Sequence, residues 1–574
     1  MGDKIAASPY KLRMKTDVSC QQLCSPELSE ADMKNFQNLV DNEYKVHMQL
    51  DGLPVAIHEN RLTSHGFPVG YRGDDGVRYI FKHLSFVVKY HESDAFEGSR
   101  IVGFEVVAPS VNRQRQEGLP QGDQKNEGSG GEAGSGNMQG RRRERHLAEN
   151  EEGVLNACRE STDMTEFSRQ SVESPQKVTF TYDVRWEYSN TPWADRWDQY
   201  INGNPEREIH YFSIVNSLMI TLFLTGVVAM IMLKTVKRDI STYNEMQTVE
   251  DTQDESGWKL VHGDVFRPPS FSPMLLSVLC GSGMQVLAMT LSTITFAFMG
   301  FLSPANRGGM LTAILVLFVL MGSFAGYWSA TVYKFFNGKK WKRSTLVTAL
   351  LFPSIVFAIY WALDVLVWTR EASTAISVPM FALLLFLWFF VSMPLVFVGS
   401  YFGFRAETYT IPVRVNQIAR HVPEQMWYTH PAFAIALGGI LPFGAVCIEL
   451  FFIMSALWMH QIYYVFSFLY VVFFILIATC AEITMVMCYF QLCNEDYRWW
   501  WRAFLSAGSS AGYLFVYSIW FFYSKLPITG FVPTMVYFGY MLVIALTFFL
   551  LTGSCGFFAC FWFVRKIYSA IKVD

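Results

Sequence analysis

The sequence predicts a polytopic α-helical membrane protein with nine transmembrane helices and an N-terminal, sandwich-like domain rich in β-strands. Residues 273–564 are almost unbroken apolar sequence, whereas residues 1–205 are polar and contain short runs in which apolar and polar residues alternate. A membrane-crossing helix needs ~20 apolar residues, and alternation is typical of strands with one buried face. Of the 574 residues, 51% are hydrophobic and only 17% are charged, a balance that is unusual for a soluble protein.

The N-terminal domain, residues 1–205, contains runs that read as strands separated by turn residues. In these runs alternate side chains are apolar, so one face of each strand is expected to pack and the other to face water. This pattern suits an antiparallel sheet. A β-sandwich is the simplest arrangement, although four strands are few for one, and a short helix is expected near residues 36–39. The predicted strands are residues 44–50, 79–90, 100–108 and 177–188.

Residues 112–176 of this domain lack any such pattern. They are rich in Gly, Gln, Glu and Arg and hold few residues that form a core. Such a composition cannot bury enough apolar surface to offset the entropy of ordering the chain. We therefore predict a disordered insertion.

Nine segments are long and apolar enough to cross a membrane. The first stands apart and is followed by a polar loop, 234–272. The other eight form a bundle over residues 273–564, and a short tail, 565–574, follows them. The nine segments are residues 211–233, 273–301, 309–335, 345–368, 376–403, 431–456, 461–490, 503–523 and 531–563.

The distribution of Lys and Arg over the connections predicts the orientation of the chain. Positive charge stays on the cytoplasmic side. One set of connections, which includes 234–272, 404–430 and the tail, is rich in Lys and Arg, whereas the alternate set has only Arg307, Arg370 and Lys525. The N-terminal domain is therefore expected to be lumenal and the C-terminus cytoplasmic, which requires an odd number of spans. The expected partner is membrane lipid and not nucleic acid, since the net charge of −3 is close to neutral.

Three acidic residues lie inside predicted spans: Glu449, Glu482 and Asp364. An ionisable group in hydrocarbon is costly and therefore suggests a functional site. The three acids could carry protons or cations if they converge. Hydrogen bonding between neighbouring helices is the simpler explanation, and because the acids lie on different helices, their spacing in sequence does not decide between the two.

Glycines recur four residues apart in three of the predicted spans. Glycine allows helix backbones to approach closely in lipid. Packing inside the bundle is the simpler explanation for any one of them, and a lateral groove that admits a Gly-rich helix of a partner protein is the alternative. The pairs are Gly322 and Gly326, Gly399 and Gly403, and Gly508 and Gly512.

Enzymatic motifs are absent from the sequence. It contains no HExxH or Walker sequence, and its ten cysteines do not form paired CxxC spacings of the kind that bind zinc. We therefore expect no catalytic residues, no cofactor and no metal site.

Four strings of the sequence resemble a known family, the nonaspanins or transmembrane nine superfamily. They are GWKLVHGDVFRPP (257–269), PAFAIALGGILPFGAVCIELFFI (431–453), LCNEDYRWWWRAF (492–504) and RKIYSAIKVD (565–574). The resemblance covers nearly the whole chain outside 112–176. It implies a lumenal β-rich domain, nine spans and residence in Golgi and endosomal membranes.

The resemblance also implies a function. It suggests that the protein assists the trafficking, sorting or surface localisation of other membrane proteins with Gly-rich helices, with links to adhesion and phagocytosis. The alternative, from the residues alone, is an ion- or proton-coupled transporter or channel that uses the three intramembrane acids.

The C-terminal tail ends in Lys572-Val573-Asp574. Taken alone, these residues are a charged tail exposed to solvent. The resemblance implies that Lys572 and Asp574 form a trafficking signal, which a cytoplasmic coat complex reads to return the protein to the Golgi.

The N-terminus departs from the family. Members of the family begin with a signal peptide and a further lumenal segment before the part that is similar to residues 2–10. We therefore expect that the chain begins in the middle of the lumenal domain, which would also explain why only four strands are recognised.

Overall fold

The computed structural model describes two compact units, which divide between residues 206 and 207. The first is rich in β-strands and the second is helical. The residues described are 7–59, 62–73, 76–93, 98–107, 169–173, 177–197, 207–231, 257–302, 308–369, 375–427, 430–458, 466–526 and 530–569, with 233, 237, 241 and 528 as single positions.

The main sheet of the N-terminal unit has six strands, in the order β1-β13-β10-β11-β5-β6. β10 is parallel to β13 and β11 is parallel to β5, whereas the other pairs are antiparallel. The prediction of an antiparallel sheet is therefore wrong for these two pairs, because alternation reports which face of a strand is buried and not the direction of its neighbour. The strands are β1 (Val18–Cys24), β5 (Ala56–Glu59), β6 (Leu62–His65), β10 (His83–Glu92), β11 (Ser99–Val107) and β13 (Phe180–Tyr188).

Both faces of the main sheet are covered near its centre. On one face Phe86, Phe104 and Tyr182 are almost fully buried, and the rings of Phe86 and Phe104 stack with centroids 5.8 Å apart. The other face was expected to be wet, but His83 and Thr181 are also buried there. These two side chains satisfy each other, since His83 Nδ1 lies 2.8 Å from Thr181 Oγ1, and a hydrogen-bonded polar pair can be buried at little cost.

A second sheet has three strands in the order β12-β9-β8. Its strands are β8 (Gly70–Arg72), β9 (Arg78–Phe81) and β12 (Arg169–Ser171). The predicted strand 79–90 is thus two strands, β9 and β10, that separate at Lys82 and enter different sheets. β12 lies within residues 112–176, so the predicted disordered insertion is wrong at its C-terminal end; residues 112–168 and 174–176 lie outside the described residues.

The predicted strand 44–50 forms only short pairings. β2 (Lys45–Val46) pairs with β7 (Phe67–Pro68), and β3 (Gln49–Leu50) pairs with β4 (Leu53–Pro54). Asp51 and Gly52, both with positive φ, make the turn between β3 and β4. This turn reverses the chain before a longer strand can extend.

The predicted helix near residues 36–39 is longer than expected. α1 runs from Glu30 to Asp41 and begins at a capping box, in which the Ser29 side chain accepts from the Asp32 amide and Asp32 accepts from the Ser29 amide. This arrangement satisfies amides that the first helical turn leaves without partners. α1 buries Met33 and Val40 against Val172 and Val178.

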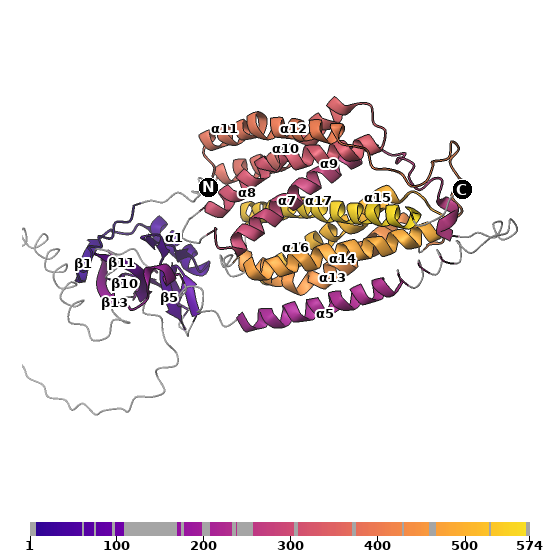
Figure 1. The fold of residues 1–574 in the computed structure, drawn as a ribbon. Helices are drawn as coiled ribbons and strands as arrows, with labels where there is room; N and C mark the ends of the chain where they lie inside the picture. The colour runs from indigo at the N-terminus through magenta and orange to yellow at the C-terminus, as the bar shows by residue number, and fades with distance from the viewer. Residues whose placement is uncertain are drawn as a thin grey trace, which may run out of the picture. The chain divides into compact units, whose positions relative to one another are not determined.

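The helical unit contains seven segments, among the residues described, that are long and apolar enough to cross a membrane (Figure 1). Two of these segments are composite, because α8 and α9 meet at Met321 and the π-helix η4 joins α11 to α12. The segments are α7 (Pro273–Phe298), α8–α9 (Gly309–Leu320, Gly322–Phe335), α10 (Trp341–Trp368), α11–η4–α12 (Val378–Phe386, Leu387–Ser392, Met393–Arg405), α13 (Pro431–Trp458), α14 (Phe466–Cys493) and α17 (Phe531–Ser569).

The two remaining expected spans, 211–233 and 503–523, are not among these seven segments. The first corresponds to α5 (Arg207–Ile231), whose described side chains form an apolar stretch over Val215–Met230. The second is divided at Ser509 into α15 (Trp499–Gly508) and α16 (Ser510–Lys525). The chain is a polytopic helical membrane protein, and the total of nine spans stays a prediction.

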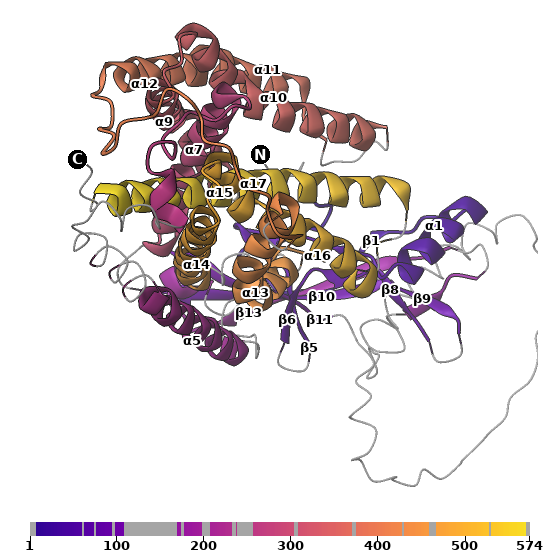
Figure 2. The ribbon, with the colours of Figure 1, turned by 90° about the vertical axis from the view of Figure 1, so that its right-hand side faces the viewer.

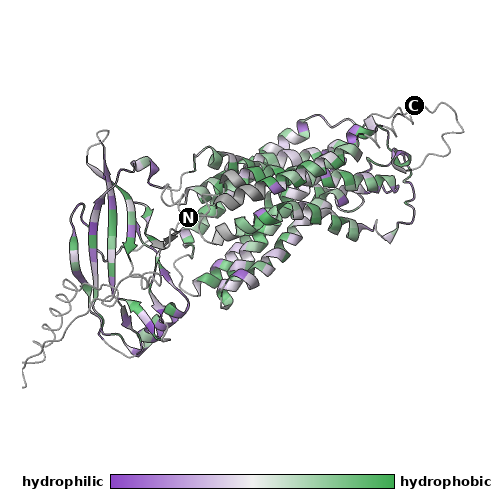
Figure 3. Cartoon of the chain, turned by 90° about the horizontal axis from the view of Figure 1, so that it is seen from below, coloured by the Kyte–Doolittle hydropathy of each residue, from purple (hydrophilic) through white to green (hydrophobic). Residues whose placement is uncertain are grey.

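Within the helical unit, α17 lies at the centre and α5 lies at the edge. α17 packs against α7, α10, α14, α15 and α16, and Figure 2 shows it between the α9–α12 helices and the α13–α14 pair. α5 contacts α13 and α14. The helices are predominantly apolar over their length, whereas the strands of the N-terminal unit mix apolar and polar residues (Figure 3).

Candidate functional site

The edge helix α5 presents a row of hydroxyl groups to the bundle. Ser217, Thr221 and Thr225 are each four residues apart, which places them on one face of a helix. Ser217 and Thr221 are buried, whereas the large side chains Met219 and Phe223 on other faces are 66% and 72% exposed. We call Ser217, Thr221 and Thr225 the α5 hydroxyl row.

Two of the three predicted intramembrane acids meet this row. The Ser217 hydroxyl donates a hydrogen bond to Glu449 Oε1 on α13, and Thr225 Oγ1 lies 2.7 Å from Glu482 Oε1 on α14. Glu449 is fully buried. The α5 hydroxyl row therefore links both acids to the helix at the edge of the bundle.

The two acids do not form a pair that shares one site. Ser217 and Thr225 are eight residues apart on α5, which corresponds to about 12 Å along the helix axis. Each carboxyl group therefore has its own hydroxyl partner. The arrangement is a line of polar contacts between α5 and the α13–α14 pair.

The third acid, Asp364, lies elsewhere. It is on α10, and its Oδ1 accepts a hydrogen bond of 2.9 Å from the backbone amide of Ile376, just before α11. This contact fixes the connection between α10 and α11. The structure thus brings Glu449 and Glu482 to one helix and leaves Asp364 apart from them.

The hydrogen bonds of Thr225 bear on the protonation of Glu482. Thr225 Oγ1 lies 2.8 Å from the Thr221 carbonyl oxygen and 2.7 Å from Glu482 Oε1, yet a hydroxyl has only one proton to donate. The Thr225 hydroxyl can therefore donate to only one of these two oxygens at a time, and donation in the other direction, from Glu482 to Thr225, needs a neutral carboxyl. Glu482 Oε2 is buried and has no hydrogen-bond partner among the described residues.

The glycines of α9 and α12 face one another across a close helix–helix contact. A Cβ atom on Gly326 would lie 2.0 Å from the Val396 carbonyl oxygen, and one on Gly399 would lie 1.9 Å from the Ser323 carbonyl oxygen. Gly403 would meet the Tyr327 carbonyl oxygen at 2.5 Å. These distances leave no room for a side chain, so backbone packs directly against backbone.

Gly322, Gly508 and Gly512 have looser surroundings. A Cβ on Gly322 would lie 3.3 Å from the Ser392 carbonyl oxygen, and one on Gly508 would meet the Phe549 ring at 2.7 Å. Gly512 has nothing within 4 Å of the corresponding position. Of the six predicted glycines, those on α9 and α12 therefore pack against the neighbouring helix inside the bundle, whereas Gly512 faces open space.

The trafficking signal predicted at Lys572 and Asp574 lies outside the described residues, which end at Ser569. It stays a prediction. The described residues also contain no group of three or more His, Cys, Asp and Glu side chains that could hold a metal ion.

A cap at one end of the bundle, which the sequence reasoning missed, joins segments far apart in the chain. The indole nitrogens of Trp499, Trp500 and Trp501 donate hydrogen bonds of 2.9, 2.8 and 2.7 Å to the carbonyl oxygens of Val265, Arg267 and Phe271. The Tyr568 hydroxyl donates to the Trp258 carbonyl oxygen at 2.7 Å. We call residues 257–271, 494–502 and 565–569 the bundle cap.

The tryptophans of the bundle cap are packed inside the protein. A Trp next to a membrane span is often found at the membrane–water interface, but Trp499 and Trp500 are 0% and 2% exposed. Their run of three residues holds the Gly257–Phe271 segment in place. Three of the four strings that carry the family resemblance thus contribute to this one cap.

Comparison with known proteins agrees with the sequence resemblance. Residues 1–531 match the family described as EMP70, Endomembrane protein 70. Among curated relatives, Transmembrane 9 superfamily member 10 of Arabidopsis thaliana is 46% identical, and the match covers 100% of this chain and 87% of the relative.

Animal relatives match over the same extent. Transmembrane 9 superfamily member 4 of Homo sapiens is 41% identical over 100% of this chain and 87% of the relative, and member 2 of Rattus norvegicus is 42% identical over 100% and 85%. No solved structure matches the chain. An identity above 40% along the whole chain, together with the apolar helices and the β-rich unit, identifies the chain as a member of the transmembrane 9 superfamily.

Proposed function

We propose that this protein resides in Golgi and endosomal membranes and assists the trafficking, sorting or surface localisation of other membrane proteins. Its membership in the transmembrane 9 superfamily supports this proposal. The observation that carries it is the row of hydroxyl–carboxyl contacts between α5 and the α13–α14 pair. These contacts offer polar groups, at the edge of the bundle, to a transmembrane helix of another protein.

The attachment of α5 supports such a role. Large apolar side chains of α5 are exposed over much of its surface, including Met219, Leu222, Phe223 and Met230, and among its described side chains the buried ones are the hydroxyls Ser217 and Thr221. Hydrogen bonds between membrane helices contribute only ~0.6 kcal/mol on average, so a partner helix with polar residues can replace them. Glu449 and Glu482 would then bind the partner helix in place of α5, or beside it.

The close glycine contacts of α9 and α12 leave α5 as the better place for a partner helix to bind. Since carbonyl oxygens fill the space beside Gly326 and Gly399, a partner helix cannot pack there without separating the two helices. The edge of the bundle at α5 needs no such separation. In this proposal the predicted coat signal at Lys572 and Asp574 returns the protein to the Golgi after each cycle, and the links to adhesion and phagocytosis follow from the surface proteins that it delivers.

Two substitutions of Glu449 test the proposal in cells that lack the native protein. Glu449→Gln keeps an oxygen that accepts from Ser217, whereas Glu449→Leu removes it. We expect Glu449→Gln to restore the surface amount of dependent membrane proteins, measured by surface biotinylation, and Glu449→Leu to lower it several-fold. Asp364→Asn is the control, since Asp364 contacts the α10–α11 connection and should restore delivery fully.

A second candidate function is proton-coupled transport, which the hydrogen-bond chain from Glu482 through Thr225 to Thr221 favours. In that case the acids must gain and lose protons. Purified protein in vesicles with a pH-sensitive dye inside would show proton flux that Glu482→Gln abolishes. Failure of Glu449→Gln to restore delivery, together with such a flux, would replace the sorting proposal by this one.

A further inference from the structure

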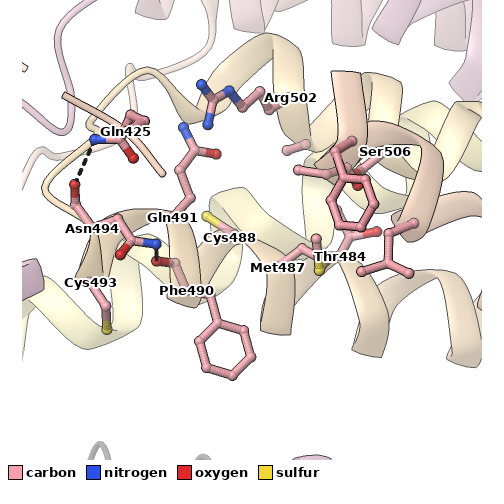
Figure 4. A pocket seen from close by; sticks show the side chains of 14 residues that line it. Gln425, Thr484, Met487, Cys488, Phe490, Gln491, Cys493, Asn494, Arg502 and Ser506 are labelled. Carbon is pink, nitrogen blue, oxygen red and sulfur yellow. Dashed lines mark hydrogen bonds between the residues drawn. The ribbon is translucent and has the colours of Figure 1, made fainter. Parts of the chain in front are cut away.

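A cavity of about 470 Å³ lies at the ends of α13, α14 and α15, beside the connection that precedes α13. Figure 4 shows the Gln425, Gln491 and Arg502 side chains at one end of it and Met487, Thr484 and Ser506 at the other. Its volume is within the range of sites that hold small molecules. The cavity adjoins the bundle cap, to which Asn494 and Arg502 belong, but neither the three tryptophans of the cap nor the α5 hydroxyl row lines it.

One hydrogen-bond donor in this cavity lacks an acceptor among the described residues. Gln491 Nε2 is buried and donates to none of them. Next to it, Arg502 Nη2 lies 2.8 Å from Asp496 Oδ2, an oxygen that has no hydrogen-bond partner among the described residues. The contact is therefore an ion pair without a hydrogen bond, and the Arg502 side chain is only 14% exposed. A buried donor without an acceptor is costly, so the Gln491 amide beside the Arg502 cation indicates a missing anionic ligand.

The charge around the cavity is positive. Asp496 is fully buried and pairs with two arginines, since Arg498 Nε donates to its Oδ1 at 3.0 Å while Arg502 is close to its Oδ2. One carboxylate between two guanidinium groups leaves one positive charge unbalanced. Arg498 is 57% exposed and does not line the cavity, whereas Arg502 does. Among the described residues that line the cavity, Arg502 is therefore the one that carries a charge.

Much of the remaining lining is apolar, and part of it opens toward the outside of the bundle. Phe433 and Leu437 on α13 are 43% and 39% exposed, and Phe490 on α14 is 50% exposed. In a helix bundle that crosses a membrane, such exposed side chains face hydrocarbon. The cavity thus joins a positively charged, donor-rich end to a surface covered by lipid chains.

We propose that this cavity binds one anionic phospholipid. Its phosphate accepts hydrogen bonds from the Arg502 guanidinium and the Gln491 amide, and one acyl chain leaves between α13 and α14 along Phe433 and Leu437. Arginine is well suited to phosphate because its planar group donates in a fork. The connection beside the cavity is one that its Lys and Arg content predicts to be cytoplasmic, and anionic lipids are concentrated in the cytoplasmic leaflet.

Native mass spectrometry of the purified full-length protein tests the proposal. After delipidation, phosphatidylserine or phosphatidylcholine is added at equal concentration, and the lipid-bound fraction is measured. We expect phosphatidylserine to bind in a one-to-one ratio and more tightly than phosphatidylcholine. Gln491→Leu should weaken phosphatidylserine binding about tenfold, as expected for the loss of one hydrogen bond to a charged group, and it leaves the Arg502–Asp496 ion pair in place.

Arg498→Gln and Arg502→Gln form a matched pair of variants, since both arginines flank Asp496 and only Arg502 lines the cavity. Arg502→Gln should abolish the preference for phosphatidylserine, and Arg498→Gln should keep it. The melting temperatures of both variants are measured to confirm that they are folded. Equal losses in the two variants, or no loss in Gln491→Leu, would overturn the proposal. Displacement of the lipid by millimolar inorganic phosphate would show that the site selects a free anion, which also overturns it.

Discussion

Asp183 shows how one carboxylate fixes a local irregularity in the main sheet. The β1–β13 pairing shifts register between Val18 and Gln21, and Cys20 within this shift has a φ of 47°. The Cys20 amide donates to Asp183 Oδ1, and His83 Nε2 lies 3.2 Å from Oδ2. Cys20 is also disulfide-bonded. The irregular backbone is therefore held by a hydrogen-bonded carboxylate and a covalent link.

The pKa of Asp183 leads to a prediction on acid stability. Burial raises this pKa, but the hydrogen bonds from His83 and the Cys20 amide outweigh burial, so the net pKa is lowered. A carboxylate with a lowered folded pKa stabilises the fold fully above its unfolded pKa of about 4 and loses this effect as pH falls through the folded value. Asp183→Asn should therefore lower the thermal midpoint of the N-terminal unit at neutral pH, and the difference from the native protein should shrink in acid. A difference that grows below pH ~4 would contradict this assignment.

Gly326 and Gly512 form a matched pair for testing close packing at the scale of a residue. A methyl group on Gly326 would overlap the Val396 carbonyl oxygen, whereas one on Gly512 would meet nothing within 4 Å. Overpacking typically costs about 1–3 kcal/mol. We expect Gly326→Ala to lower the melting temperature in detergent and Gly512→Ala to leave it unchanged or slightly higher, since alanine favours helix. The measurement is the fraction of monodisperse protein after heating.

At the scale of the element, α15 shows how a short helix anchors a distant segment. Trp500 stacks on Trp499 with ring centroids 3.9 Å apart, and its indole donates to Arg267 across more than 200 residues of sequence. Trp500→Phe keeps an aromatic ring and removes this hydrogen bond. The loss leaves the Arg267 carbonyl without its donor and should destabilise the bundle cap by about 1–3 kcal/mol.

Limited trypsin digestion measures this prediction for the bundle cap directly. Cleavage after Lys259 should accelerate in Trp500→Phe, because the 257–271 segment is released more often. Trp501→Phe is the control, since the Trp501–Phe271 hydrogen bond is exposed to solvent and contributes less. Similar acceleration in both variants would show that the ring contacts, and not the part-buried Trp500–Arg267 hydrogen bond, hold the segment.

The strands and α5 show that a local sequence pattern predicts an element but not the elements that it contacts. Alternation located β10, β11 and β13 correctly, because the face of each strand that packs must be apolar. It did not reveal that β10 and β13 are parallel, since the pairing depends on a connection of more than 80 residues. Likewise Ser217 and Thr225 are ordinary residues in an apolar segment, and only contact with Glu449 and Glu482 gives them a role.

For the whole molecule, the sequence predicts that the two ends of the chain lie on opposite sides of the membrane. Tags at the N-terminus and the C-terminus of the protein in intact Golgi-derived vesicles test this through protease protection. The C-terminal tag should be digested and the N-terminal tag protected, because an odd number of spans separates them. Digestion of both tags would require an even number of spans and would place the N-terminal unit on the cytoplasmic side instead of in the lumen.

The sequence by itself determined the β-rich unit, the apolar helices and the family, because each depends on local composition or on long, specific strings. It also showed which acids and glycines the predicted spans contain, although not what those residues contact. Only the tertiary structure decided that Glu449 and Glu482 meet α5 while Asp364 does not, that the α9 and α12 glycines face each other, and that Trp499 and Trp500 hold a distant loop. The physical reason is that such contacts depend on how helices far apart in the chain pack side by side, and no periodicity within one helix encodes its neighbour.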